Sequence, residues 1–82
     1  MSKKPTLKTC YRGGNADGQP GYWIGFDYDA ELVETLKSSI PHTRRCWDSN
    51  AKLWWVSADY DDWLCNFFGN FYALAHMQGK LF

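Results

Sequence analysis

Aromatic side chains constrain the fold of this chain more than any other feature, because five Trp, five Tyr and five Phe stand in a sequence of only 82 residues. A chain this short buries only about 60% of its unfolded surface, so its stability depends on large buried side chains. One core is expected, since a single domain usually takes roughly 100–150 residues. The rings that this core does not hold are expected on the surface, where aromatic clusters mark recognition sites.

The hydrophobic pattern predicts an α+β fold with the element order ββαββα. Apolar and polar residues alternate over 7–12 and over 22–26, as in half-buried strands, and a turn-rich segment separates the two. Helical spacing follows over 31–40 and stops at Pro41, while 44–56 has the composition of a β-hairpin. The helices are expected on one face of a mainly antiparallel sheet, with the other face open.

The segment after the hairpin has helical spacing and a capping residue at Ser57 or Asp59. Gly69 leaves two interpretations open, either one continuous helix or a break followed by a second short helix. Residues 1–5 are predicted to form a flexible basic tail, and residues 6–82 the single domain.

The hairpin is predicted to close through a four-residue turn at 48–51, which places Arg45 opposite Trp54 and Trp47 opposite Lys52. Side chains then divide between two faces. The apolar face carries Cys46, Leu53 and Trp55. The opposite face mixes cations with indole rings and carries Arg45, Trp47, Lys52 and Trp54.

This mixed face is the predicted binding site. Indole rings stack on unpaired bases for about 1–3 kcal/mol each and cations meet phosphates, so the combination suits single-stranded or forked DNA. Neighbouring side chains extend the predicted nucleic-acid-binding set to Lys8, Trp23, Arg44, Arg45, Trp47, Lys52 and Trp54. An alternative stays open, in which Trp47 and Trp54 are core residues and the alkyl stems of Arg45 and Lys52 lie over their rings.

Charge and cysteine content limit the class of protein. Nine Lys and Arg balance nine Asp and Glu, and a net charge of zero disfavours strong nonspecific coating of DNA. Three cysteines, an odd number, and the lack of a hydrophobic segment after Met1 argue against a secreted disulfide scaffold. No apolar run approaches the roughly 18 residues that cross a bilayer. A cytoplasmic protein without membrane contact is expected.

Neither a metal site nor a catalytic site is predicted, and no cofactor is expected. Zinc modules usually bring their ligands in close pairs, and the only near pair in the sequence is His42 with Cys46. A Cys–His dyad of the same two residues lacks an oxyanion donor and a second orienting group. The carboxylates between Asp59 and Asp62 are explained by the preference of a helix N-terminus for negative charge.

The middle of the chain resembles the HARP-type domain of annealing helicases and related accessory domains that precede the motor of DNA helicases. The matching residues are Tyr28-Asp29, Glu31-Leu32-Val33, Leu36-Lys37, Ile40-Pro41, Arg44-Arg45, Trp47-Asp48, Lys52 and Trp54. The resemblance covers roughly residues 22 to 65 and implies a domain that helps to engage forked or partly single-stranded DNA. The sequence departs from the family at Cys46, which separates Arg45 from Trp47 and favours a bulge there. Ser49 and Asn50 stand in place of Pro and Glu, and 82 residues do not hold an ATPase motor.

Two functions are therefore predicted. The first is a non-enzymatic accessory module that binds nucleic acid through the mixed face. The second is a small protein-interaction module, such as a phage or mobile-element factor that docks on a replication or host protein, for which neutral charge and surplus aromatic residues argue.

Overall fold

A four-stranded antiparallel sheet organises residues 4–76, the part of the chain that the computed structural model describes. The strands are β1 (Thr9–Arg12), β2 (Gly21–Gly25), β3 (Arg45–Asp48) and β4 (Leu53–Ser57), in the spatial order β1-β2-β4-β3. The helices are α1 (Ala30–Ser39), α2 (Asp61–Phe67) and α3 (Phe71–His76), with the short 3-10 helices η1 (His42–Arg44) and η2 (Ala58–Tyr60). The predicted α+β fold and its ββαββα order are confirmed. The outermost parts of the predicted tail and domain, residues 1–3 and 77–82, lie outside the described range.

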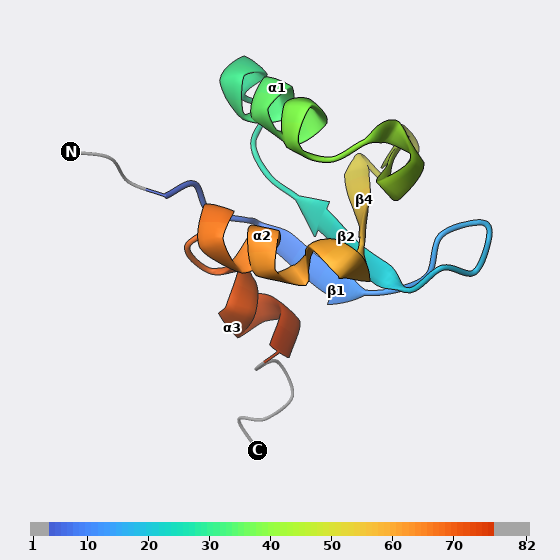
Figure 1. Ribbon diagram of the computed structural model, residues 1–82. Helices are drawn as coiled ribbons and strands as arrows, with labels where there is room; N and C mark the ends of the chain where they lie inside the picture. The colour runs from blue at the N-terminus through green and yellow to red at the C-terminus, as the bar shows by residue number, and fades with distance from the viewer. Residues whose placement is uncertain (1–3, 77–82) are drawn as a thin grey trace.

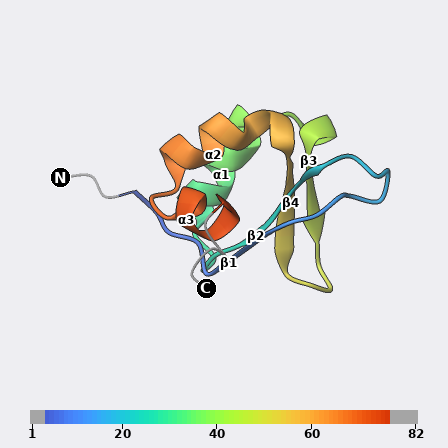
Figure 2. The same cartoon turned by 90° about the horizontal axis from the view of Figure 1, so that it is seen from below.

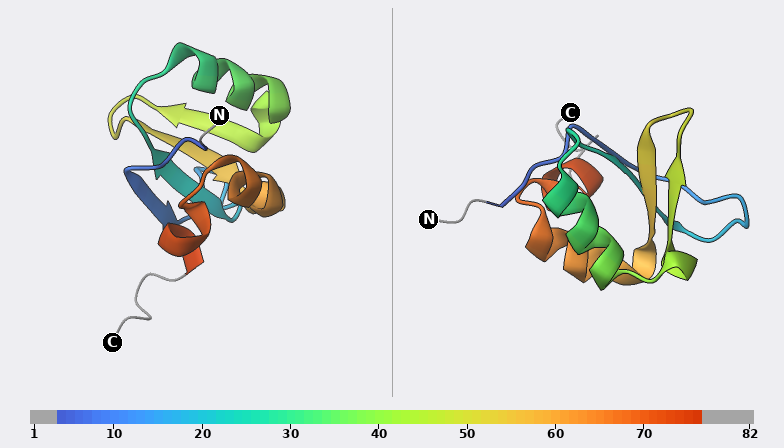
Figure 3. Two further views of the ribbon diagram at one scale, coloured as in Figure 1. Left: turned by 90° about the vertical axis from the view of Figure 1, so that its left-hand side faces the viewer. Right: turned by 90° about the horizontal axis from the view of Figure 1, so that it is seen from above.

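The three helices pack on the same face of the sheet (Figure 2). The largest side chains closed off between the two layers are Ile24, Leu36, Ile40, Val56, Leu64, Phe68 and Phe71. Figures 1 and 3 show that α1 runs alongside the β3–β4 hairpin, whereas α3 lies against β1. Among residues 4–76 no helix has both the length and the apolar character needed to cross a bilayer.

Local sequence fixes both ends of α1. Asp29 caps the first turn, because its Oδ1 accepts hydrogen bonds from the backbone N–H groups of Glu31 at 3.0 Å and Leu32 at 3.2 Å. The helix stops at Ile40, since the following Pro41 disfavours helical backbone in the residue before it. Ile40 is fully buried, so the end of α1 is anchored in the core beside the hairpin.

The hairpin closes two positions away from the predicted register. Trp47 pairs with Trp54 rather than with Lys52, and Cys46 pairs with Trp55. The predicted pairing is therefore wrong, but an even shift leaves each strand residue on its predicted face, and only Lys52 leaves the mixed face for the turn. The bulge predicted at Cys46 is also wrong, because the pairing of β3 with β4 is continuous across it.

Asp48 causes the difference in register. Its Oδ1 accepts hydrogen bonds from the backbone N–H groups of Asn50 at 2.9 Å and Ala51 at 3.1 Å, so the turn begins after Asp48 rather than at it. The Asp48 carbonyl accepts the N–H of Lys52 at 2.7 Å, and Lys52 completes the turn with a φ of 60°. That value lies in the left-handed region, so the backbone at Lys52 is not extended and does not belong to the strand.

Gly69 and Asn70 break the last helical segment, so the second of the two interpretations is confirmed. The Asn70 side-chain amide pairs with the backbone of Leu7: its Oδ1 accepts the Leu7 N–H at 2.8 Å, and its Nδ2 donates to the Leu7 carbonyl at 2.9 Å. The N–H of Gly69 donates to the carbonyl of Pro5 at 2.9 Å. In a continuous helix the Gly69 N–H would bond to a carbonyl of the same helix. The break leaves it free to bond to Pro5, so the contacts of Gly69 and Asn70 tie α2 and α3 to the segment before β1.

Trp55 is buried on the sheet face that the helices leave uncovered, with 1% of its surface exposed. Its Nε1 donates a hydrogen bond to the carbonyl of Gly13 at 3.0 Å, which brings the loop 13–20 against this face. On the neighbouring strand, a Cβ at Gly21 would lie 2.6 Å from the Trp55 ring and would also collide with the carbonyl of Val56. Glycine at this position is required for the close approach.

Replacing Gly21 by Ala is expected to lower the free energy of unfolding by about 1–3 kcal/mol, the usual cost of forcing an extra carbon into a packed site. The change in urea midpoint at constant slope measures this effect.

Gly69→Ala is the matched control, because the nearest atom to a Cβ there is on the Lys4 side chain at an ordinary 3.5 Å. Equal urea midpoints for the two variants would contradict the packing of Trp55 on Gly21.

Candidate functional site

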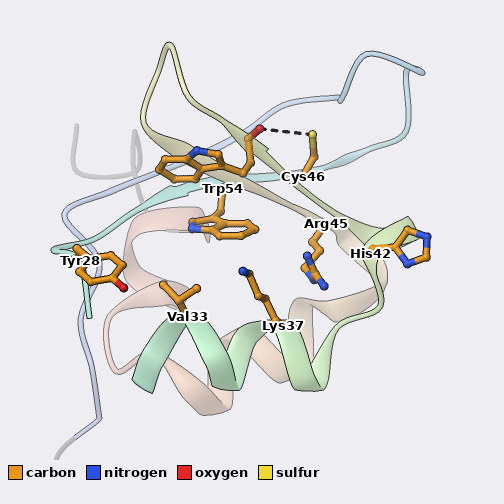
Figure 4. A pocket seen from close by; sticks show the side chains of 8 residues that line it. Tyr28, Val33, Lys37, His42, Arg45, Cys46 and Trp54 are labelled. Carbon is orange, nitrogen blue, oxygen red and sulfur yellow. Dashed lines mark hydrogen bonds between the residues drawn. The ribbon is translucent and has the colours of Figure 1, made fainter. Parts of the chain in front are cut away.

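A groove of about 560 Å³ lies between α1 and the β3–β4 hairpin (Figure 4). It is called here the α1–hairpin groove, and its lining residues are Tyr28, Val33, Lys37, His42, Arg45, Cys46, Trp47 and Trp54. Its volume falls in the range of roughly 300–1,000 Å³ that small-molecule sites occupy.

Val33 and Lys37 form the helix side of the groove. They stand one turn apart on α1, so their side chains lie on the same face of the helix. Figure 4 shows both directed from α1 toward the hairpin, with the Lys37 ammonium group facing the indole of Trp54. The residue before α1, Tyr28 at the edge of the groove, is 82% exposed. The cap that starts α1 at Asp29 thus also fixes where these side chains stand.

Trp47 and Trp54 form the hairpin side. The two residues are direct partners across β3 and β4, and their ring centroids lie 5.2 Å apart with the planes tilted by 50°. Trp54 belongs to the core, with 8% of its surface exposed, whereas Trp47 is 46% exposed. A fixed, buried indole therefore supports a second indole that presents part of its surface to solvent.

Arg45 joins the end of α1 to the hairpin. Its Nε donates a hydrogen bond to the carbonyl of Ile40 at 2.8 Å, which satisfies a backbone acceptor just past the helix. This bond uses only one of the five N–H groups of the guanidinium, and the side chain still lines the groove. Arg45 is therefore held in position while donors remain for a ligand.

The groove is lined by cations and contains no carboxylate. Lys37 and Arg45 contribute to its lining, and none of its lining residues is Asp or Glu. Among residues 4–76, neither Lys37 nor Arg45 has a carboxylate within ion-pair distance. The local potential therefore favours an anionic ligand although the net charge of the chain is zero.

The structure brings three of the predicted site residues together in the groove, namely Arg45, Trp47 and Trp54. The sequence predicted that they lie on an open sheet face, and this prediction is wrong. This side of β4 faces the helices, and Trp54 is part of the core. Of the two tryptophans for which core and surface positions were both possible, Trp54 is a core residue and Trp47 is half exposed.

The other four predicted residues lie outside the groove lining. Lys52 is in the hairpin turn, and Arg44 ends η1. Trp23 lies on the opposite face of the sheet and donates its Nε1 hydrogen to the Gly14 carbonyl at 3.3 Å. Lys8 is exposed and forms an ion pair of 3.1 Å with Asp27.

Sequence reasoning missed Tyr28, Lys37 and His42 as groove residues. Lys37 reaches the groove because it lies on the side of α1 that faces the hairpin. The signal was available in one respect, since Tyr28 and Lys37 belong to the segment that carries the family resemblance.

A separate polar cluster lies where α2 and α3 meet β2. The Tyr22 hydroxyl donates to Asp61 Oδ2 at 2.5 Å, and His76 Nε2 lies 2.8 Å from the same oxygen. The guanidinium of Arg12 lies 3.2 Å from His76 Nδ1. A guanidinium only donates, so Nδ1 accepts and Nε2 carries the hydrogen that bonds to Asp61. The cluster fixes the end of α3 against β2.

Burial and hydrogen bonding shift the pKa values in this cluster. Burial, helped by the hydrogen bond to Asp61, raises the pKa of Tyr22 to about 12. Burial alone would raise the pKa of Asp61, but the hydrogen bonds from Tyr22 and His76 outweigh it and hold the pKa below its usual value. Burial and the nearby Asp61 charge raise the pKa of Cys65, which makes its thiol a weak nucleophile at neutral pH. Among residues 4–76 no three His, Cys, Asp or Glu side chains gather as metal ligands.

Comparison with known proteins gives no match: no family model fits the sequence, and no curated protein or solved structure shows significant similarity to the chain. The resemblance to the HARP-type domain therefore stays a prediction, and the function has to be argued from the geometry of the groove.

Replacing Asp61 by Asn is expected to flatten the loss of stability in acid. The pKa of Asp61 in the folded chain lies below its unfolded value of about 3.9, so the unfolded chain takes up the proton first. The wild type therefore keeps this stabilisation above about pH 4 and loses it as the pH falls further. Because the Asp61 side chain is 31% exposed, the effect is expected to be at most about 1 kcal/mol. Urea unfolding between neutral pH and about pH 3 measures it.

Asp62→Asn makes the same change of charge one residue along α2 and serves as the control. If the free energy of unfolding fell as steeply below pH 4 in the Asp61 variant as in the control variant, the role assigned to the Asp61 hydrogen bonds would be contradicted.

Proposed function

We propose that the α1–hairpin groove binds a single-stranded segment of nucleic acid, as in single-stranded or forked DNA, and that the domain acts as a non-enzymatic binding module. The observation that carries the proposal is the half-exposed indole of Trp47 in a groove that contains Lys37 and Arg45 and no carboxylate. Stacking of bases on aromatic rings together with cations for the backbone is how proteins hold single strands without reading their sequence.

The support of Trp47 by Trp54 favours stacking. The inner indole is buried and the two centroids are 5.2 Å apart, so the outer ring is held before a ligand arrives. A side chain that is already ordered loses less conformational entropy on binding, and more of the stacking energy appears as affinity. Tyr28, highly exposed at the edge of the groove, offers a second ring to a neighbouring base.

The groove favours single strands over duplexes. In a duplex each base is paired and stacked on its neighbours, so no base face is free to meet Trp47, and only phosphate contacts remain. Phosphate contacts alone give weak binding here, because the chain has no net positive charge. A fork or a partly unwound strand supplies both unpaired bases and phosphates.

Binding of a short labelled oligothymidine is expected to weaken as salt rises. With two phosphates neutralised by Lys37 and Arg45, the slope of log K against log salt should be about −1.4 for a single strand. Lys37→Gln should reduce the size of that slope by about 0.7, because one phosphate contact is lost. Fluorescence anisotropy at several salt concentrations measures the slope.

Lys8→Gln is the matched control, since it removes an exposed cation outside the groove. A salt slope near zero in the wild type, or equal slopes for the two variants, would contradict phosphate binding in the groove.

Trp47→Ala is expected to weaken oligothymidine binding by about 5- to 150-fold, the loss of one stacked base. Trp47→Phe keeps a ring in place and should restore most of the affinity. The same anisotropy titration gives the comparison, with a thermal melt of each variant to establish that it is folded.

Tyr11→Ala removes a comparably exposed ring, 47% against 46%, from the other face of the sheet and should leave affinity unchanged. If the Tyr11 variant loses more affinity than the Trp47 variant, the site lies on the uncovered face instead.

A protein partner is the second candidate, and one observation favours it. β3 is an edge strand, and Cys46 and Trp47 on it are exposed. An edge strand offers free backbone N–H and C=O groups to an extended peptide, and the groove beside it offers pockets for side chains. Failure of single-stranded DNA and RNA to bind even at low salt would favour this second function.

A further inference from the structure

A second cavity, of about 440 Å³, lies on the opposite side of β3 from the α1–hairpin groove. It contains Trp55, which follows Trp54 along β4 and so points to the other face of the sheet. Its other lining residues come from the loop 13–20, η1 and β3 and are Asn15, Ala16, Asp17, Gln19, His42, Thr43, Arg45 and Cys46.

The two cavities meet at the edge of the sheet. His42, Arg45 and Cys46 line both of them, and Figure 4 shows these three side chains toward the end of the groove that lies away from Tyr28. The exposed edge of β3 is the boundary between the two cavities. A ligand longer than one nucleotide can therefore extend from Trp47 over this edge into the second cavity and stay in contact with the protein throughout.

The chemistry of the second cavity differs from that of the groove. The groove has cations and no carboxylate, whereas the second cavity adds the carboxylate of Asp17 and the amide of Gln19. A carboxylate repels phosphate, but it accepts hydrogen bonds from the N–H groups on the edge of a base. The second cavity therefore suits a base edge, and the shared Arg45 suits the phosphate between two nucleotides.

We infer that the second cavity is a base-recognition subsite that selects guanine in the nucleotide next to the one stacked on Trp47. This inference rests on the proposed function, because it takes the groove as the binding site of the neighbouring nucleotide. The Watson–Crick edge of guanine carries two adjacent donors, N1–H and the N2 amino group, which match the two oxygens of the Asp17 carboxylate. Thymine offers a single donor between two carbonyl oxygens that a carboxylate repels.

Gln19 supplies a further acceptor. Its Oε1 is shielded from solvent and has no hydrogen-bond partner among residues 4–76. Such a buried acceptor costs about 1–3 kcal/mol, and a donor on the base relieves this cost. Because this oxygen is shielded in the free protein, the Gln19 side chain has to turn toward the cavity to reach such a donor.

The loop that carries Asp17 and Gln19 is held in shape by its own hydrogen bonds. Asn15 Oδ1 accepts the backbone N–H groups of Asp17 and Gln19, both at 2.9 Å, and the Asn15 N–H donates to the Gln19 carbonyl at 3.1 Å. The bond from Trp55 to the Gly13 carbonyl holds the start of the loop on the sheet. The backbone from which Asp17 and Gln19 project is therefore ordered in the free protein, which lowers the entropic cost of binding a base.

The test compares three oligonucleotides of equal length: oligothymidine, the same strand with one central guanine, and the same strand with one central inosine, which lacks the N2 amino group. The wild type is expected to bind the guanine strand about tenfold more tightly than oligothymidine, with the inosine strand in between. Asp17→Asn should remove this preference, because affinity for the guanine strand falls toward the affinity for oligothymidine. Gln19→Leu should reduce the preference for guanine.

Asp59→Asn, an equal change of charge outside both cavities, is the control and should keep the preference for guanine. Equal affinity of the wild type for all three strands, with binding that depends on Trp47, would overturn the subsite and leave the proposed function standing. A preference that survives Asp17→Asn would also overturn it. Failure of all three strands to bind the wild type would overturn both the subsite and the proposed function.

Discussion

The pairing of β4 with a strand on each side determines on which face of the sheet its two successive tryptophans lie. β4 places two tryptophans in succession, and because side chains alternate along a strand, Trp54 enters the helix layer and Trp55 the opposite face. Trp54 supports Trp47 in the α1–hairpin groove, and Trp55 forms part of the second cavity. A slip of one residue in this pairing would exchange the two indoles and remove both cavities.

The fold could be predicted from the sequence because its signals are local and strong. Strand alternation, the helical run that ends at Pro41, and the aromatic hairpin each survive in the structure with small changes of boundary. The register of the hairpin could not be predicted in this way, since it depends on which residue starts the turn. The Asp48 side chain accepts the N–H groups of Asn50 and Ala51, and a prediction based on loop length does not include these bonds.

The candidate site was predicted only in part, for a reason that lies in tertiary structure. Arg45, Trp47 and Trp54 share a strand face, and period-two alternation is sufficient to group them. Lys37 joins them only because α1 lies beside the hairpin, and a helix packed at that position is a long-range arrangement without a local signature. Asp17 and Gln19 lie in the turn-rich segment predicted between the first two strands, and the sequence carried no sign that the Trp55 ring would pack beneath this loop.

The amide pairing between Asn70 and Leu7 joins residues 63 positions apart in the chain. Contacts between residues so far apart in the chain slow folding, because the entropy cost of closing the long loop comes before the contact forms and stabilises the fold. During synthesis, the segment leading into the first strand has left the ribosome long before its partner exists, so the edge of the sheet next to α3 is finished late. Until Asn70 has been made, that edge stays open to other strands, and the nascent chain passes through a stage in which shielding by a chaperone has physical value.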